Sequence, residues 1–126
     1  MKPDRNRLRI LVVAGGAIGT LLRFASTEFV AQGTRFPWAT LLVNVIGSVG
    51  LGYLVGRSLS RTVPMARLAF VGVGAMGALT TFGAVMVQVV ALIESGSVGL
   101  AITYLVASVL LCLAGALATL RLGTIR

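Results

Sequence analysis

The stretch Gly72–Val85 reads Gly-Val-Gly-Ala-Met-Gly-Ala-Leu-Thr-Thr-Phe-Gly-Ala-Val and lies inside the longest apolar segment of the chain. It carries no charge, yet it is too rich in glycine and threonine for a plain lipid-facing helix. Backbone groups that leave a helix inside a bilayer must be buried in protein or face a cavity. The stretch therefore predicts a membrane helix that breaks near its middle and offers backbone groups to an ion pathway.

The composition agrees with a membrane protein. Of the 126 residues, 57% are hydrophobic, and the mean hydropathy is +1.00. Histidine is absent, three residues are acidic, and Cys112 is the single cysteine. This excludes a metal or redox site built from His and Cys side chains. An enzyme is not expected either, because the chain has no nucleophile–base constellation.

Four apolar segments are long enough to cross a bilayer, which predicts a single all-α membrane domain over residues 1–126. We expect spans at about 8–30, 38–56, 65–93 and 98–120. The basic start of the first span resembles a signal peptide, but no cleavage site bounded by polar sequence follows, so we expect a retained helix. The third span exceeds the ~20 residues that one crossing needs. Its glycines loosen the first half, and Thr80-Thr81 can start a second half.

Two helix faces carry small or polar residues. Gly15 and Gly19 form a Gly-x-x-x-Gly pair, which lets another helix approach closely and suggests association with further subunits. In the second span Thr40, Asn44 and Ser48 share one face at helical spacing. Asn44 is strongly polar near the middle of that span, which favours either a functional role or interhelix hydrogen bonding.

Basic residues mark one end of the bundle. Four spans put both termini on one side, where nine of the eleven cations fall: Lys2, Arg5, Arg7, Arg9, Arg57, Arg61, Arg67, Arg121 and Arg126. Only Arg23 and Arg35 fall on the other side. This bias predicts a multi-pass plasma-membrane protein with one fixed orientation and cytoplasmic termini. Because the cations lie at the ends of apolar runs without interleaved aromatic residues, nucleic acid is not an expected partner, whereas membrane lipid is.

Three motifs resemble the small fluoride-channel family (Fluc, also called CrcB). They are Gly-Gly-Ala-Ile-Gly-Thr-Leu-Leu-Arg at 15–23, Pro-Trp-Ala-Thr-Leu-Leu-Val-Asn at 37–44 and Gly-Ala-Leu-Thr-Thr-Phe at 77–82. Their order and spacing agree with the family over almost the whole chain. The resemblance implies a passive channel that exports cytoplasmic fluoride, built as an antiparallel dimer with two pores.

The resemblance also implies roles for single residues. Asn44 would lie along the fluoride path, Phe82 would belong to a box of rings lining the pores, and Arg23 would sit near an entrance. Polar positions of the fourth helix correspond to Tyr104 and Ser108. Backbone carbonyls of the broken helix would hold a structural sodium ion, a role that maps to Gly77 and Thr80.

Elementary chemistry supports these implied roles. A pore for fluoride must replace tightly held water with donors. The Asn44 amide supplies N–H donors, and hydroxyl groups can add more; the candidates are Thr40, Ser48, Thr81 and Ser108. An aromatic ring has a positive edge, so the Phe82 ring can meet an anion edge-on. For Arg23 a lipid-interface position remains an alternative to an entrance role.

The chain departs from the family pattern after Phe82. From the position of Thr81 the family pattern reads Thr-Phe-Ser-Thr-Phe-Ser. In this chain Gly83 and Ala84 replace the two hydroxyl residues that follow the first ring, and Val85 replaces the second ring. An antiparallel homodimer needs one sequence to insert both ways, which a nine-to-two charge bias opposes. We therefore expect one half of an antiparallel heterodimer, paired with a related subunit of opposite bias.

Two other function classes stay open. A non-conducting partner subunit of such a channel would fit the lost polar lining. A small multidrug exporter also has four helices, but it needs an intramembrane carboxylate. The acids Asp4, Glu28 and Glu94 all lie near the ends of spans, so proton-coupled exchange is disfavoured.

Overall fold

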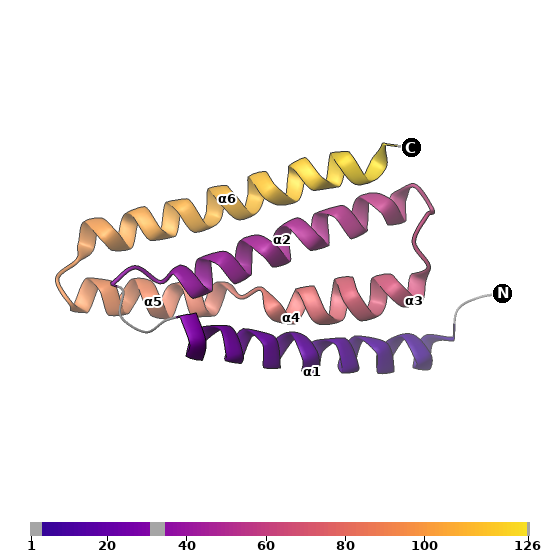
Figure 1. The fold of residues 1–126 in the computed structure, drawn as a ribbon, viewed down its shortest axis with the longest axis horizontal. Helices are drawn as coiled ribbons and strands as arrows, with labels where there is room; N and C mark the ends of the chain where they lie inside the picture. Colours follow the sequence, from indigo (N-terminus) through magenta and orange to yellow (C-terminus); the bar gives the residue numbers. More distant parts are fainter. Residues whose placement is uncertain (1–3, 31–34, 126) are drawn as a thin grey trace.

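Four membrane-length helical segments follow one another up and down, so that consecutive segments are antiparallel, and the start of the first lies at the same end as the close of the last (Figure 1). The computed structural model describes residues 4–30 and 35–125. Within these residues all regular structure is helical. Lys2 and Arg126, which belong to the charge count, lie outside the described residues.

Three of the segments are single helices, α1 (Arg5–Val30), α2 (Trp38–Leu59) and α6 (Val98–Thr124). The third segment is composite and spans residues 65–94; it consists of α3 (Met65–Arg67), η1 (Leu68–Met76), α4 (Gly77–Leu79) and α5 (Phe82–Glu94). The helices extend up to four residues beyond the expected spans, because they continue past the apolar core into the basic ends.

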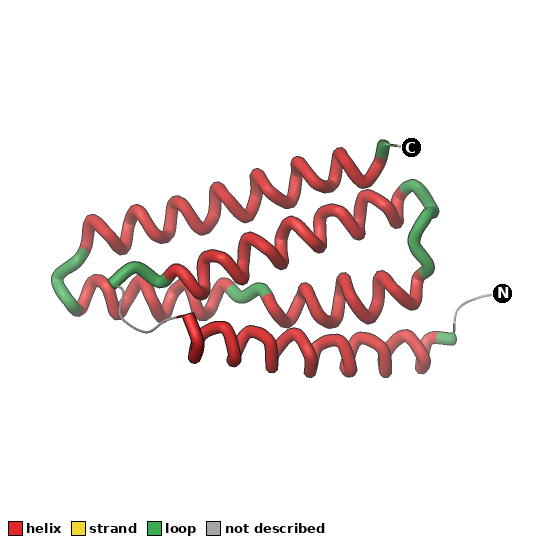
Figure 2. The backbone as a smooth tube through the Cα atoms, viewed as in Figure 1, coloured by secondary structure: helices red, strands yellow, loops and turns green. Residues whose placement is uncertain are grey.

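The predicted break in the third segment is confirmed, and it falls at Thr80 and Thr81, drawn as loop between two helical stretches in Figure 2. Both threonines are extended, with φ/ψ of −80°/143° and −154°/125°. The Thr80 hydroxyl donates to the Met76 carbonyl at 3.1 Å, and the Thr81 hydroxyl accepts from the Ala84 N–H at 3.3 Å. The Thr80 hydroxyl thus caps the C-terminal end of the helical stretch before the break, and the Thr81 hydroxyl caps the N-terminus of α5.

The first half of the third segment is a π-helix from Leu68 to Met76, which the residue pattern does not signal. Its glycines do more than make the helix flexible. Gly72 and Gly74 are buried against neighbouring helices. A Cβ on Gly74 would lie 2.7 Å from the Val12 carbonyl oxygen of α1. These glycines therefore serve close packing in addition to any backbone freedom.

Gly15 and Gly19 are used inside the subunit, which corrects the expectation that they face other subunits. A Cβ at Gly15 would overlap the Phe70 carbonyl oxygen of η1, and one at Gly19 would overlap that of Ala75. The backbones of α1 and η1 therefore touch, as small residues four apart permit. The same device joins α2 to α6, where Gly52 and Gly56 face the backbone of α6.

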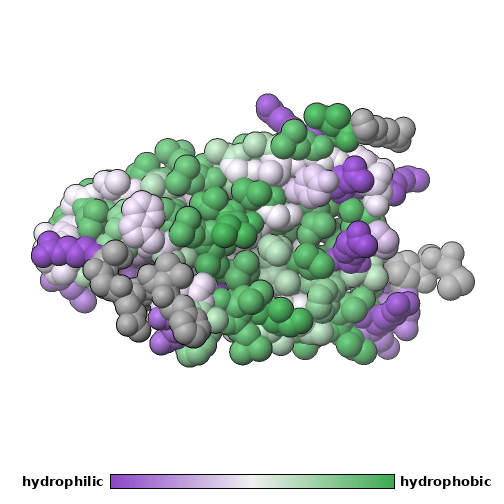
Figure 3. Space-filling view, viewed as in Figure 1, coloured by the Kyte–Doolittle hydropathy of each residue, from purple (hydrophilic) through white to green (hydrophobic). Residues whose placement is uncertain are grey.

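Apolar side chains cover the middle of the molecule, and the hydrophilic residues gather at its two ends (Figure 3). The buried core is small and lies between α2, α5 and α6; it contains Leu41, Val85, Leu92, Ala101 and Tyr104. Many large apolar side chains are exposed instead. In water such a surface would be unstable, whereas lipid is its natural solvent.

The turn after α2 is a Schellman motif with arginine at its left-handed position. Thr62 N–H donates to the Arg57 carbonyl at 3.0 Å and Arg61 N–H to the Ser58 carbonyl at 2.9 Å, as the motif requires. Arg61 has φ 54°, a conformation that costs a side-chain-bearing residue about 1–2 kcal/mol.

Arg61→Gly is therefore expected to raise the stability of the protein by about 1 kcal/mol. The measurement is the thermal denaturation midpoint in detergent. Arg57→Gly is the matched control, because Arg57 lies within α2 and glycine inside a helix destabilises by about 0.5–1 kcal/mol. A midpoint lowered by both substitutions would contradict the argument.

Candidate functional site

The side chain of Asn44 on α2 holds the break in the third segment. Its Oδ1 accepts the Thr81 N–H at 2.7 Å, and its Nδ2 donates to the Thr81 carbonyl at 3.1 Å. Asn44 is buried, so its amide gives the Thr81 N–H and carbonyl the hydrogen bonds that water would otherwise supply. One N–H of the amide remains available for another acceptor.

The break leaves a helix N-terminus at membrane depth. The first N–H groups of a helix have no acceptor within it, and they carry the positive end of the helix dipole. In α5 the Thr81 side chain caps the third N–H, that of Ala84. The N–H groups of Phe82 and Gly83 remain beside the break, which favours an anion there.

A cavity of about 210 Å³ opens beside this N-terminus. Polar groups from α2, the break and α6 meet in its wall, and its lining comprises Asn44, Ser48, Thr80, Thr81, Phe82, Val85, Ser108, Val109 and Cys112. The lining holds no carboxylate and no fixed cation. It offers amide and hydroxyl donors without a charge that would trap an ion, which suits passage through the site.

Two hydroxyl groups on α6 are buried and have no hydrogen-bond partner of good geometry among the described residues, although that of Tyr104 lies near those of Ser108 and Thr40. They are the Ser108 Oγ and the Tyr104 Oη, on side chains that are 3% and 0% exposed. An unpaired buried hydroxyl is unfavourable by about 1–3 kcal/mol. Ser108 lines the 210 Å³ cavity, but its Oγ is buried, so the side chain would have to turn before the hydroxyl could donate into that space.

Arg23 lies on the far side of Asn44 from this cavity. Together with Thr40 and Asn44 it lines a space of only about 10 Å³, with Thr27, Val43, Leu79, Thr81 and Ala84 completing the wall. That volume is about the smallest that holds one water molecule. Arg23 and Thr40 therefore lie close to the Asn44–Thr81 pair. All four residues line this narrow cavity, which we call the constriction.

Phe82 projects out of the subunit, because 64% of its side chain is exposed, although it also contributes to the cavity wall. Val85, one turn later on α5, is 2% exposed and belongs to the core. The position of the missing second ring therefore faces inward in this subunit. The ring that is present is free to reach a neighbouring molecule.

The break also frees backbone carbonyls. In a continuous helix the Thr81 N–H would bond the Gly77 carbonyl, but here it bonds Asn44. The Gly77 carbonyl accepts instead from the Thr80 hydroxyl, at a long 3.5 Å. Oxygen atoms left free at a helix C-terminus are suitable ligands for a hard cation.

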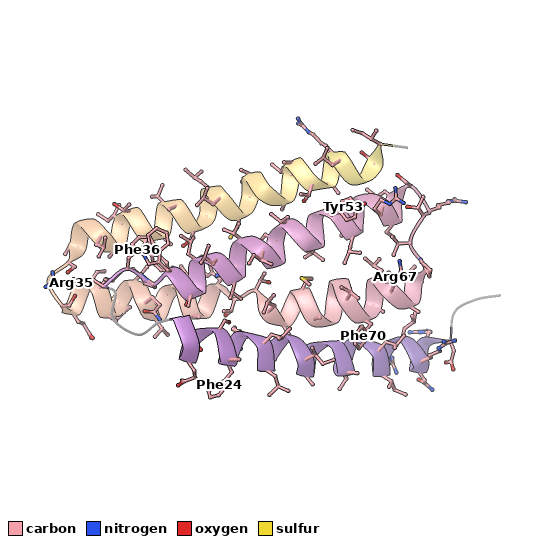
Figure 4. The ribbon with its side chains drawn as sticks, in the orientation of Figure 1. Phe24, Arg35, Phe36, Tyr53, Arg67 and Phe70 are labelled. Atoms are coloured by element: carbon pink, nitrogen blue, oxygen red, sulfur yellow. The ribbon has the colours of Figure 1, made fainter. Side chains whose placement is uncertain are left out.

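Some residues of the site have no motif to reveal them. Cys112 and Val109 line the larger cavity, and Thr27 lines the constriction. Helical spacing is the only signal, because Cys112 follows Ser108 by one turn and Thr27 follows Arg23 by one turn. Arg35 also lines cavities at the end opposite the termini, where Figure 4 shows it beside Phe36.

Comparison with known proteins gives a consistent result. The profile of the family described as "CrcB-like protein, Camphor Resistance (CrcB)" matches residues 10–120. A relative from Rhodospirillum centenum, named fluoride-specific ion channel FluC, is 38% identical over 92% of this chain and 94% of its own length. Relatives from Thermus thermophilus (FluC) and Mycobacterium bovis (FluC 1) are 38% and 41% identical, covering 90% and 91% of this chain and 91% and 89% of their own lengths.

Proposed function

Because this chain belongs to the CrcB-like family, whose similar relatives are fluoride-specific ion channels, we propose that it exports cytoplasmic fluoride passively as a subunit of a fluoride channel. The observation that carries this proposal is the uncharged cavity at the start of α5. Its lining brings the Asn44 amide and a positive helix end to a small anion, with Ser48 and Ser108 in the same wall. These donors replace hydration without the tight binding that a carboxylate or ammonium group would bring.

The charge distribution supports a heterodimer with a related subunit of opposite orientation. The basic residues flank the ends of helices that meet at the termini end of the bundle. Such a bias favours one insertion with cytoplasmic termini, whereas an antiparallel homodimer needs two. In such a dimer the exposed Phe82 ring would reach into the partner. The partner would supply the second ring of the family pattern, which Val85 replaces in this chain.

A sodium ion at the break fits the freed carbonyls. The carbonyl oxygen atoms of Gly77 and Thr80 would hold it, since Gly77 has lost its helical donor. Sodium prefers neutral oxygen ligands, and a fixed cation there would raise the local potential for anions.

A non-conducting partner subunit is the second candidate, favoured by the apolar part of the cavity wall. Part of the wall of the 210 Å³ cavity offers few hydrogen-bonding groups, because it is formed by Val85, Val109 and Cys112. A cationic-drug exporter has less support, because no acidic residue lines any of the four described cavities.

Fluoride efflux from liposomes tests these proposals. The chain is reconstituted alone, and together with a related four-helix subunit of opposite charge bias; protein-free and partner-only liposomes are controls. We expect slow efflux from the chain alone and fast, chloride-excluding efflux from the pair, exceeding that of the partner alone. Fast efflux from the pure chain would refute the heterodimer. A pair no faster than the partner would refute a conducting role for this chain.

A further inference from the structure

Two adjoining cavities lie at the end of the bundle opposite the termini, and they share Arg35 and Gln88. The larger has a volume of about 310 Å³ and is completed by Ala91, Leu92, Ser95 and Ser97, at the end of α5 and in the turn that follows. The smaller, of about 90 Å³, runs inward between α1 and α2 and reaches Thr27 and Thr40. Arg35 therefore stands where open space narrows into the subunit.

Shared wall residues connect these cavities to the break. Thr27 and Thr40 line both the 90 Å³ cavity and the 10 Å³ constriction. Asn44 and Thr81 line both the constriction and the 210 Å³ cavity. The four cavities therefore adjoin one another from Arg35 to the start of α5, with two shared wall residues between each and the next. The volumes of these cavities fall from about 310 to about 10 Å³, so an ion that passed along them would shed most of its water before it reached Asn44.

The Arg35 guanidinium forms no direct ion pair with the described residues, and the side chain is exposed. Glu28 and Glu94 are near the same end of the bundle, but neither lines any of the four cavities. The strongly polar groups where these two cavities meet are therefore the Arg35 guanidinium and the half-buried Gln88 amide. A cation in a cleft with low-dielectric walls raises the local concentration of anions.

We propose that Arg35 and Gln88 form an anion-collecting mouth that supplies this subunit's pathway from the end opposite the termini. The mouth rests on the proposed function, because it presupposes that an anion moves through the connected cavities. Arg35 acts by its charge at long range, whereas the Gln88 amide donates to an ion that has begun to lose water. The guanidinium lies outside the constriction, so it concentrates fluoride without holding it.

Arg35→Gln tests the mouth by its dependence on ionic strength. The assembly that conducts in liposomes is measured at about 10 mM and about 1 M of an impermeant salt, where the screening lengths are ~30 Å and ~3 Å. We expect fluoride flux to fall about 3–10-fold at low salt and to match wild type at high salt. Arg121→Gln, the same change at the opposite end, is the control and should show no such salt-dependent loss.

A charge-restoring variant separates charge from folding. Arg35→Cys, made with Cys112→Ser, is labelled in detergent with a cationic or an anionic methanethiosulfonate before reconstitution. Flux at low salt should rise with the cationic label and fall with the anionic one, each relative to the unlabelled protein. Equal flux with both labels, or equal loss for Arg35→Gln at both salt concentrations, would overturn the mouth while leaving the channel intact. A silent wild-type assembly would overturn the channel itself.

Discussion

Asn44→Ala is expected to reduce fluoride efflux to the rate of protein-free liposomes and to destabilise the protein. The substitution leaves the Thr81 N–H and carbonyl without the partners they have at 2.7 and 3.1 Å. Each buried backbone group left unpaired is unfavourable by about 1–3 kcal/mol, and lipid offers no substitute. The start of α5 then shifts away from the cavity. Efflux and the denaturation midpoint in detergent measure the two effects.

Two further variants separate the roles of Asn44. Asn44→Asp keeps the acceptor for the Thr81 N–H but places a carboxylate beside the anion path, so stability should be partly retained while efflux is lost. Thr119→Val is the structural control, because it removes a different interhelix hydrogen bond, from the Thr119 hydroxyl of α6 to the Val49 carbonyl of α2 at 2.8 Å, and Thr119 does not line the cavity. Near-normal efflux from Asn44→Ala would refute the account of the break.

Gly15→Ala is expected to separate α1 from η1, with a loss of about 1–3 kcal/mol in stability. The new methyl group would overlap the Phe70 carbonyl oxygen and approach the Ala75 nitrogen at 3.0 Å. Backbone atoms cannot turn aside as a side chain can. Since α1 carries Arg23 to the constriction, efflux should fall with stability. The denaturation midpoint and the monodisperse fraction in detergent measure the change.

Gly16→Ala is the matched control for this prediction. Gly16 is the next residue of the same helix, but a Cβ there would meet only the Ala78 Cβ, at 4.0 Å. That is ordinary van der Waals contact, and alanine is favoured over glycine inside a helix by about 0.5–1 kcal/mol. The control should therefore be neutral or slightly stabilising. Equal losses from both substitutions would contradict the packing argument.

Local patterns were sufficient to predict the number of spans and the place of the break. Apolar runs longer than ~20 residues mark membrane helices, and the third run is too long for one crossing. The adjacent Thr80 and Thr81 mark a helix end, because threonine side chains bond nearby backbone groups. Both hydroxyl groups do so in the structure.

Contacts between distant segments were not predictable in the same way. The pattern marked Asn44 as functional or as a hydrogen-bonding partner between helices, but nothing local shows that its partner is the Thr81 backbone, 37 residues away. The glycine pair on α1 signals close packing but does not name η1 as its neighbour. The cavities are composites of several helices, so Cys112 and Arg35 join them only once the chain is folded.

The pairing of the helices has a consequence for how the protein is made. The closest packing joins α1 to η1 and α2 to α6, while α1 and α2, which are neighbours in the chain, touch much less. The first two spans to leave the ribosome therefore share few of the contacts that hold the finished fold together. Each must wait in the bilayer, α1 for the third segment and α2 for the last, so the polar Asn44 stays unpaired in the meantime. We therefore expect the helix bundle to assemble only when translation is nearly complete.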